Sequence, residues 1–313
     1  MKRYKLAMLS LSMAILLVMV VYAKPLVLLN LLVKSNYIFI LLGFSVAFLS
    51  IILGVLKWKV LLNSVGFAEL FPVQLLGWTI SNFSPGKAAE PVKAVLLKMV
   101  KGTDVSSSLA SIIWERITDV ISLVLFSLLA ISTLSVASNF FLAGLISLAV
   151  FCCILLVSFS VLYNRGFGIK FFNFIRKLPV LKRLPKNFME LFYKVRIEKI
   201  RIIKCFLIAL ATWGMQGVIL YFSLGAFGVQ INPIILSGIV AFSVVIGIAS
   251  SLPGGLGTTE VVMAFLLGLN SVESSVAIAS AIVFRFMTIW FVNFLGGVSF
   301  LYLNKKFEIK NII

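Results

Sequence analysis

Two glycine-rich stretches carry residues whose types and spacing suit the binding of an anion. The stretch LPGGLGTTE, at 252–260, lies between two runs apolar enough to cross a bilayer. Its proline and glycines break a helix and leave backbone groups unpaired, which a membrane tolerates only inside protein or beside water. The free N–H groups and positive dipole end of the following helix favour an anion. The candidate binding residues here are Pro253, Gly254, Gly255, Gly257, Thr258, Thr259 and Glu260.

The stretch SPGKAAE, at 84–90, repeats this arrangement and adds a lysine. Its candidate binding residues are Pro85, Gly86, Lys87 and Glu90. We expect the two helix starts to point inward from opposite sides and to form a cradle for phosphate. An ATP-binding P-loop is excluded, because its pattern GxxxxGK[ST] meets Ser81 in place of the first glycine and Ala88 in place of the final Ser/Thr.

Four ionisable residues fall inside apolar helices. Glu115, Arg116 and Asp119 stand about ten to fifteen residues into a helix expected from residue 105, and Arg285 lies in the last helix. Each costs roughly 2.5 to 3.5 kcal/mol near the bilayer centre, so each must pair or line a polar cavity. We predict that Arg116 pairs with Glu90 or Asp119, and that Arg285 pairs with Glu260. The alternative, that these pairs only lock helices together, stays open.

The two groups of residues are related by a weak internal repeat. Pro85-Gly86 aligns with Pro253-Gly254, Glu90 with Glu260, and Arg116 with Arg285, at offsets of 168, 170 and 169 residues. Three matches in order at nearly constant spacing indicate a duplication. We place repeat A at about 70–134 and repeat B at about 234–303.

The composition sets the class of protein that must position these residues. The chain has 313 residues, 61% of them hydrophobic, and a mean hydropathy of +1.14. Repeated uncharged runs are long enough to cross about 30 Å of hydrocarbon. We therefore expect an all-α polytopic membrane protein, a single integral membrane domain over 1–313. It would have about six full spans plus two helical, re-entrant hairpins that form an inverted repeat, eight or more membrane helices in all. The spans are expected at about 5–23, 37–56, 105–134, 139–163, 205–223 and 275–303, and the hairpins at 70–100 and 234–270.

Two of these elements have alternative interpretations. MKRYK followed by an apolar run resembles a signal peptide, but Lys24-Pro25 is a poor continuation for cleavage, so we interpret 5–23 as a span. Residues 70–83 are too short to cross fully, which favours re-entry. The run 234–251 is long enough for either arrangement.

The positions of the basic residues indicate that the net charge of +18 reflects membrane topology and not nucleic-acid binding. Twelve of the 28 Lys and Arg residues lie between Arg165 and Lys204, and others lie at both ends of the chain. The positive-inside rule then places the N- and C-termini in the cytoplasm and turns the two repeats in opposite directions. The basic and aromatic segment 164–204 is typical of an amphipathic helix on an anionic inner leaflet. Ordinary positive-inside topology explains its charge equally well.

Histidine is absent, which removes the commonest general base and the commonest metal ligand. The three cysteines, Cys152, Cys153 and Cys205, lie in or beside apolar helices and imply neither a disulfide framework nor a metal site. We expect no metal and no cofactor.

The stretches SPGKAAEPVKAVLL, IIWERITD and SLPGGLGTTE together resemble the flippase-like membrane family that includes the transmembrane region of lysylphosphatidylglycerol synthases. The similarity covers roughly residues 10–303. It implies a prokaryotic cytoplasmic-membrane protein that moves or handles a lipid with an anionic or charged head group. Members are also associated with isoprenoid-linked sugar and cell-envelope pathways.

Two departures from this family bear on the function. The synthases carry a soluble aminoacyl-transfer domain after the membrane region, whereas this sequence ends at Ile313, so lysine transfer to lipid is not expected. Ala89 stands where the first copy often has glycine before glutamate, which is a mild change.

We therefore expect a lipid translocase or flippase-like carrier without its own ATPase, and not an enzyme. Lys87, Arg116 and Arg285 would hold the phosphate of the head group. The carboxylates of Glu90, Asp119 and Glu260 would balance those charges or relay protons, while Gly254, Gly255 and Gly257 would let the backbone approach the substrate.

Two rival functions stay open. One is a membrane-embedded transferase acting on isoprenoid phosphate through carboxylates such as Glu90 and Asp119. The other is an accessory subunit of an envelope-synthesis complex. The expected partners are a membrane lipid with an anionic or charged head group, anionic inner-leaflet lipids at 164–204, and another copy of the chain or envelope-pathway enzymes.

Overall fold

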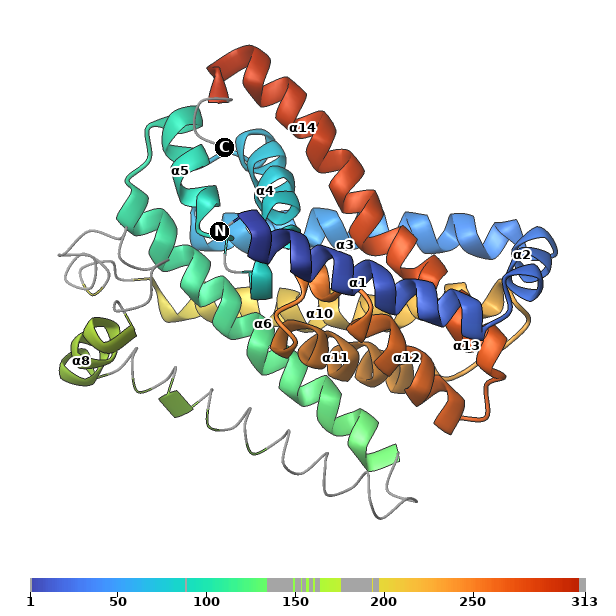
Figure 1. Ribbon diagram of the computed structural model, residues 1–313. Helices are drawn as coiled ribbons and strands as arrows, with labels where there is room; N and C mark the ends of the chain where they lie inside the picture. Colours follow the sequence, from blue (N-terminus) through green and yellow to red (C-terminus); the bar gives the residue numbers. More distant parts are fainter. Residues whose placement is uncertain are drawn as a thin grey trace.

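The computed structural model is built from helices (Figure 1). It describes residues 2–87, 89–133, 164–175 and 197–309, together with Ala149, Cys153, Leu156, Val157, Ser160 and Tyr193. All regular elements in this part of the chain are helical, as the sequence predicts.

Residues 2–87 and 89–133 form six α-helices and a short 3-10 turn. They are α1 (Lys2–Tyr22), α2 (Pro25–Val33), α3 (Tyr37–Leu61), α4 (Phe67–Asn82), η1 (Pro85–Lys87), α5 (Val92–Lys101) and α6 (Val105–Thr133). The second half holds α8 (Arg165–Ile175), α10 (Lys199–Gly225), α11 (Pro233–Ala249), η3 (Pro253–Gly255), α12 (Thr258–Leu269), α13 (Ser274–Arg285), η4 (Phe286–Trp290) and α14 (Phe291–Phe307).

Several helix ends follow from local side chains. Asn36 accepts a hydrogen bond from the backbone N–H of Ile38 and so caps α3, and Asn232 caps α11 in the same way, with Pro233 at the first helical position. Gly102 takes the left-handed conformation that ends α5.

Three helices in the described residues are long and apolar enough to cross a membrane: Tyr37–Leu61, Lys199–Gly225 and Ser274–Phe307. The number rises to four if the bent pair α1 and α2 is one span. Helix α6 has 29 residues, but Glu115, Arg116 and Asp119 interrupt its apolar surface. The predicted helix at 139–163 lies almost wholly outside the described residues, so the predicted total of eight or more is not confirmed.

The boundaries of three predicted elements differ from those in the structure. The first span does not stop at residue 23 but bends by 79° into α2, where Lys24 is left-handed and Pro25 has no N–H to continue the helix. Helix α10 begins at Lys199, inside the predicted surface segment 164–204, of which α8 forms another part. The last helix contains a π-helical segment, Phe286–Trp290, between α13 and α14.

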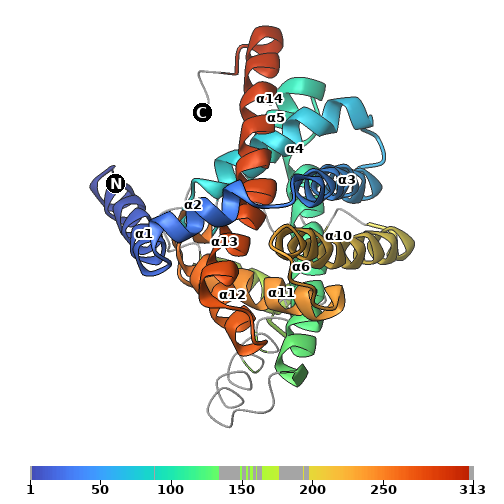
Figure 2. The same cartoon turned by 90° about the vertical axis from the view of Figure 1, so that its right-hand side faces the viewer.

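The helices pack as two sets of similar order, α3 to α6 and α10 to α14. Helices α3 and α10 lie side by side and run in opposite directions (Figures 1 and 2). The first arm of each hairpin crosses to the other set, since α4 packs against α14 and α11 packs against α6. Gly296 of α14 allows one of these contacts, because a Cβ there would overlap with Thr79 of α4. The two sets are thus interlocked.

The breaks in the two hairpins meet inside the molecule. Turn η1 contacts η3, and Gly86 and Gly254 both have positive φ, at 55° and 60°. A Cβ on Gly254 would lie 3.3 Å from the carbonyl oxygen of Asn82, at the end of α4. Glycine is therefore needed at 254 both for the backbone conformation and for the approach of the first hairpin.

Candidate functional site

A cavity of about 210 Å³ lies where the two hairpins meet. Its wall includes residues from α3, α4, α6, α10 and α11, from both breaks, and from α13 with the π-helical segment. The charged residues on this wall are Lys57, Lys87, Glu90, Arg116, Asp119 and Arg285. Uncharged polar groups are contributed by Ser50, Ser81, Asn82, Thr212, Gln216, Thr259 and Thr288, and aromatic surface by Trp78 and Trp213.

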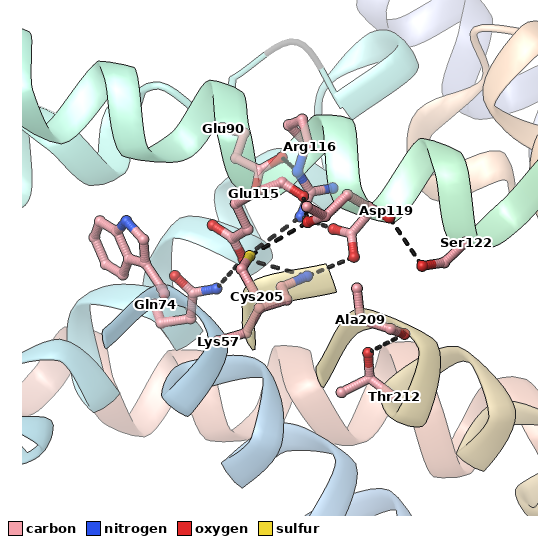
Figure 3. A network of polar contacts seen from close by, with 12 residues as sticks. Lys57, Gln74, Glu90, Glu115, Arg116, Asp119, Ser122, Cys205, Ala209 and Thr212 are labelled. Carbon is pink, nitrogen blue, oxygen red and sulfur yellow. Dashed lines mark hydrogen bonds and ion pairs between the residues drawn. The ribbon is translucent and has the colours of Figure 1, made fainter. Parts of the chain in front are cut away.

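Glu115 is the fully buried centre of a charge network beside this cavity (Figure 3). Its Oε2 accepts a hydrogen bond of 2.8 Å from Lys93 Nζ, and its Oε1 accepts one of 3.0 Å from Gln74 Nε2. Lys57 Nζ lies 3.7 Å from Oε1. Lys93 is also completely buried and lies over the ring of Trp58, with Nζ 4.7 Å from the ring centroid. The carboxylate and the aromatic ring together offset the cost of removing this ammonium group from water.

Asp119 joins three elements at the cavity wall. Its Oδ1 is 2.5 Å from Lys57 Nζ of α3 and accepts a hydrogen bond of 3.2 Å from Trp213 Nε1 of α10. Its Oδ2 is 2.8 Å from the guanidinium of Arg116, one helical turn earlier on α6. The i,i+3 spacing of Arg116 and Asp119 thus places an ion pair along α6, while Lys57 and Trp213 tie that helix to its neighbours.

Glu90 completes the network from the segment between η1 and α5. Its carboxylate lies 3.0 Å from Lys93 Nζ and 3.0 Å from Arg116 Nε. Arg116 therefore bridges Glu90 and Asp119, which confirms both of its predicted partners. The Arg116 side chain is still 37% exposed, although Glu90 and Asp119 are nearly buried. Arg116 is therefore the most exposed residue of this network.

The second hairpin and Arg285 of α13 form a smaller and more closed arrangement. Arg285 Nε lies 2.6 Å from Glu260 Oε1, as predicted, and another guanidinium nitrogen donates a 2.6 Å hydrogen bond to the carbonyl of Gly254. Glu260 Oε2 accepts a 2.7 Å hydrogen bond from the N–H of Gly257, the residue before α12. The exposed fractions of the Arg285 and Glu260 side chains are only 6% and 2%. This pair fixes the break in the second hairpin.

This geometry changes the expectation for one of the two helix starts. We expected the beginning of α12 to offer free N–H groups to a phosphate, but the carboxylate of Glu260 already binds there. An acidic side chain in the first turn stabilises the helix dipole in the way that a bound anion would. The cradle for phosphate must therefore rely on cationic side chains more than on this helix start.

Lys87 is the one cation on the cavity wall that the described residues leave unpaired. No carboxylate of residues 2–87, 89–133, 164–175 or 197–309 lies within ion-pairing distance of its Nζ. Its backbone is left-handed, with φ 59°, and its carbonyl accepts a 3.0 Å hydrogen bond from Ser81 Oγ. The chain thus holds a free positive charge at the point where the hairpins meet.

The structure brings most of the predicted site residues together. On the cavity wall lie Gly86, Lys87, Glu90, Arg116, Asp119, Gly254, Gly255, Thr259 and Arg285. Glu115 and Glu260 stand behind the wall and hold its cations. Outside the wall are Pro85, Pro253, Gly257 and Thr258. Gly257 packs against α1, since a Cβ there would lie 2.8 Å from Ile15.

Sequence reasoning missed Lys57 and Lys93 as members of the site. Neither lysine is among the candidate binding residues or the predicted ion pairs. A signal was nevertheless present: the three carboxylates Glu90, Glu115 and Asp119 outnumber the cations predicted beside them, Lys87 and Arg116. Buried carboxylates in excess require further cations.

Comparison with known proteins now identifies the family. The family model described as "Lysylphosphatidylglycerol synthase TM region" matches residues 8–296 of this chain. The chain belongs to this family. The match includes both hairpins and every charged residue of the cavity wall.

Similar curated proteins are named only as membrane proteins. A UPF0104 membrane protein from Methanothermobacter thermautotrophicus is 26% identical over 290 residues, which cover 84% of this chain and 85% of the relative. One from Pyrococcus horikoshii is 26% identical over 295 residues, covering 86% of this chain and 88% of the relative. The family match, these relatives and the apolar helices together establish a multi-pass membrane protein.

Proposed function

We propose that this protein is a flippase-like carrier that binds the anionic head group of a lipid and moves it across the membrane without its own ATPase. The observation that carries the proposal is the cavity between the two broken hairpins, with an unpaired lysine and two partly engaged arginines on its wall. Polar backbone breaks and buried charges are costly in a membrane and are retained mainly along substrate pathways.

The proposed membrane arrangement is an inverted repeat of about six full spans with two re-entrant hairpins. Three hairpin arms support re-entry: α4 has 16 residues, α5 has 10 and α12 has 12. At about 1.5 Å per residue, they fall short of the roughly 20 residues needed to cross. The opposite directions of α3 and α10 support the inversion, which is common in transporters whose broken helices meet near the midplane.

The basic residues support a cytoplasmic location for both termini in a prokaryotic cell membrane. The start of α1, the end of α3 with Lys59, α8 and the start of α10 lie at the same end of the molecule (Figure 1). The last turn of α14, with Lys305 and Lys306, points to the same side. We propose that this end faces the cytoplasm, as the positive-inside rule requires, and that α8 lies on the anionic inner leaflet with its exposed Phe167.

The size of the cavity favours the binding of a head group and not of a whole lipid. Its volume of about 210 Å³ is smaller than the roughly 300–1,000 Å³ of pockets that bury drug-sized ligands. The acyl or isoprenoid chains would stay in the membrane while the phosphate enters between the hairpins.

The state of the carboxylates favours a carrier over the rival transferase. Both carboxylates on the cavity wall, Glu90 and Asp119, are engaged by cations. A general base must be available to take a proton from the reacting group, and neither of these is free to do so. We therefore propose binding and movement of the lipid without covalent chemistry.

The test is a translocation assay on purified protein in liposomes that contain a fluorescent phosphatidylglycerol or a fluorescent isoprenoid phosphate. Added reductant bleaches the probe in the outer leaflet, so the fraction bleached reports movement. We expect wild-type protein to move one of these lipids and Lys87→Gln to lose most of that activity, because the free charge on the wall is gone.

Lys101→Gln is the matched control. It makes the same chemical change at an exposed lysine that pairs with Glu69 and does not line the cavity, and we expect full activity. If folded wild-type protein moves neither lipid, the carrier function is wrong. In that case a transferase or accessory role becomes the better explanation.

A further inference from the structure

The charged groups in and behind the cavity do not add up to zero. The described part of the chain places five cations there, Lys57, Lys87, Lys93, Arg116 and Arg285. It places four carboxylates with them, Glu90, Glu115, Asp119 and Glu260. Every carboxylate is ion-paired, and so is every cation except Lys87. One formal positive charge remains, and it belongs to a side chain on the cavity wall.

The two arginines on the wall are already compensated. Arg116 lies between Glu90 and Asp119, and Arg285 is bound to Glu260 and to the carbonyl of Gly254. Each guanidinium has five N–H donors, so donors are left for a ligand. The more exposed Arg116 can orient a phosphate, but only Lys87 supplies a charge that the protein itself does not neutralise.

The sum of the charges controls which head group can enter, because most of these charged groups are buried. In a low-dielectric interior, charges interact strongly over several ångströms, and an unbalanced charge is costly wherever it sits. A head group with one negative charge makes the site neutral. A head group with two negative charges leaves the site with one net negative charge. A zwitterionic head group leaves the positive charge of the lysine uncompensated.

We infer that the cavity selects lipid head groups with one net negative charge, that of a phosphodiester, over doubly charged phosphate monoesters and over zwitterions. This inference rests on the proposed carrier function and adds the class of substrate to it. Lys87 is the counter-ion of the phosphodiester, and Arg116 orients its oxygens.

Gln216 of α10 offers an independent way to change the sum without touching Lys87. It lies on the cavity wall, and its amide nitrogen donates a 3.2 Å hydrogen bond to Ser50 Oγ. Gln216→Glu is nearly isosteric and removes one unit of net charge from the site, as Lys87→Gln does. Gln216→Lys adds one unit. If the sum matters, Lys87→Gln combined with Gln216→Lys returns the site to its original charge.

The experiment compares three fluorescent lipids in the liposome assay at pH 7: phosphatidylglycerol, phosphatidic acid and phosphatidylcholine. Phosphate monoesters have a second pKa near 6, so phosphatidic acid is largely doubly charged there. We expect wild-type protein to move phosphatidylglycerol at least about tenfold faster than either other lipid. Lys87→Gln and Gln216→Glu should each lose this preference and favour phosphatidylcholine, and the double variant should regain it.

The outcomes separate the inference from the function on which it rests. Equal rates for phosphatidylglycerol and phosphatidic acid in wild-type protein would overturn the charge rule and leave the carrier function standing. Loss of preference in Lys87→Gln with no change in Gln216→Glu, or no rescue in the double variant, would also overturn it, since a specific lysine contact would then suffice. No movement of any lipid by folded protein would overturn both.

Discussion

Arg116 and Arg285, which align in the predicted internal repeat, have different surroundings. The Arg116 side chain is 37% exposed and bridges two carboxylates at the cavity wall. The Arg285 side chain is 6% exposed and binds one carboxylate and one backbone carbonyl. The ion pair is thus an open contact point beside the first hairpin and a closed structural clip beside the second.

The difference begins with the two glutamates. Glu260 binds the N–H of Gly257 and so caps its own helix, which leaves one oxygen for Arg285. Glu90 makes no such cap and instead binds Lys93 and Arg116. Lys57 of α3 and Lys93 of α5 join the carboxylates around Arg116, which makes this network larger than the one around Arg285.

Replacing each arginine with methionine should give the largest difference in stability between the two ion pairs. Arg285→Met leaves Glu260 buried without a cation, so we expect a loss of about 3–5 kcal/mol in the free energy of unfolding. Arg116→Met should cost less than half of this, because Glu90 keeps Lys93, Asp119 keeps Lys57, and the site borders a cavity. Thermal unfolding in detergent measures both stability losses. Equal losses would contradict the distinction between a structural role for Arg285 and a ligand-contacting role for Arg116.

In transport the order should be reversed: Arg116→Met should slow lipid movement per folded molecule more than Arg285→Met does. Arg116→Met removes an accessible guanidinium from the proposed binding wall and should nearly abolish lipid movement by protein that remains folded. The controls are the conservative variants Arg116→Lys and Arg285→Lys. Lysine keeps the charge but cannot serve two acceptors in the fixed geometry of a guanidinium, so Arg285→Lys should restore only part of the lost stability.

The sequence predicts the local half of this site well, and the reason is physical. Pro85-Gly86 and Pro253-Gly254 mark the helix breaks, since glycine with positive φ is needed there. Glu260 and Arg285 were paired correctly, because a buried acid and base in matching repeats leave few alternatives. The helical class follows from composition alone.

The other half of the site depends on contacts between distant segments. Lys57 reaches Asp119 across 62 residues, and Gln74 reaches Glu115 across 41. No local pattern specifies such a pair, because it arises only when α3, α4 and α6 pack together. The sequence alone does not predict the capping role of Glu260 for a related reason. A glutamate three residues into a helix can cap it or face a ligand, and only the packed structure distinguishes these two roles.

Two glycines at the interfaces of the interlocked helices give a second, smaller contrast. A Cβ on Gly217 of α10 would overlap with backbone atoms of Pro233 and Ser237 in α11, which cannot move aside. A Cβ on Gly54 of α3 would lie 2.6 Å from the ring tip of Trp78, which can shift. We expect Gly217→Ala to lower the free energy of unfolding by about 1–3 kcal/mol. Gly54→Ala should be nearly neutral, since alanine favours the helix by about 1 kcal/mol.

Transport should again separate the two glycine variants. Trp78 lies on the cavity wall, so a shift of its ring in Gly54→Ala narrows the space for the head group and should slow lipid movement. Gly217→Ala should lower stability with little change in the rate per folded molecule. Measured rates that follow stability in both variants would show that the position of Trp78 does not matter.

The smallest expected effect comes from an exposed ion pair outside the cavity, which sharpens the contrast with the buried ones. Glu69 Oε1 accepts a 2.7 Å hydrogen bond from Lys101 Nζ, and Oε2 accepts one from the N–H of Gly66. The bond from Lys101, followed by the one from Gly66, lowers the pKa of Glu69 below its usual 4.5. The stability that Glu69 contributes is therefore present above about pH 4.5 and is lost as the pH falls through its lowered pKa.

Glu69→Gln should thus lower the melting temperature slightly at pH 7, and the difference from wild type should vanish in more acidic buffer. The difference should also shrink at 1 M salt, because exposed charges are screened over about 3 Å there. The loss caused by Arg285→Met should persist at the same salt concentration, since solvent ions have little access to a side chain that is 6% exposed. If the change in melting temperature caused by Glu69→Gln persisted in acid and at high salt, the Glu69–Lys101 pair would be as shielded from solvent as the Glu260–Arg285 pair.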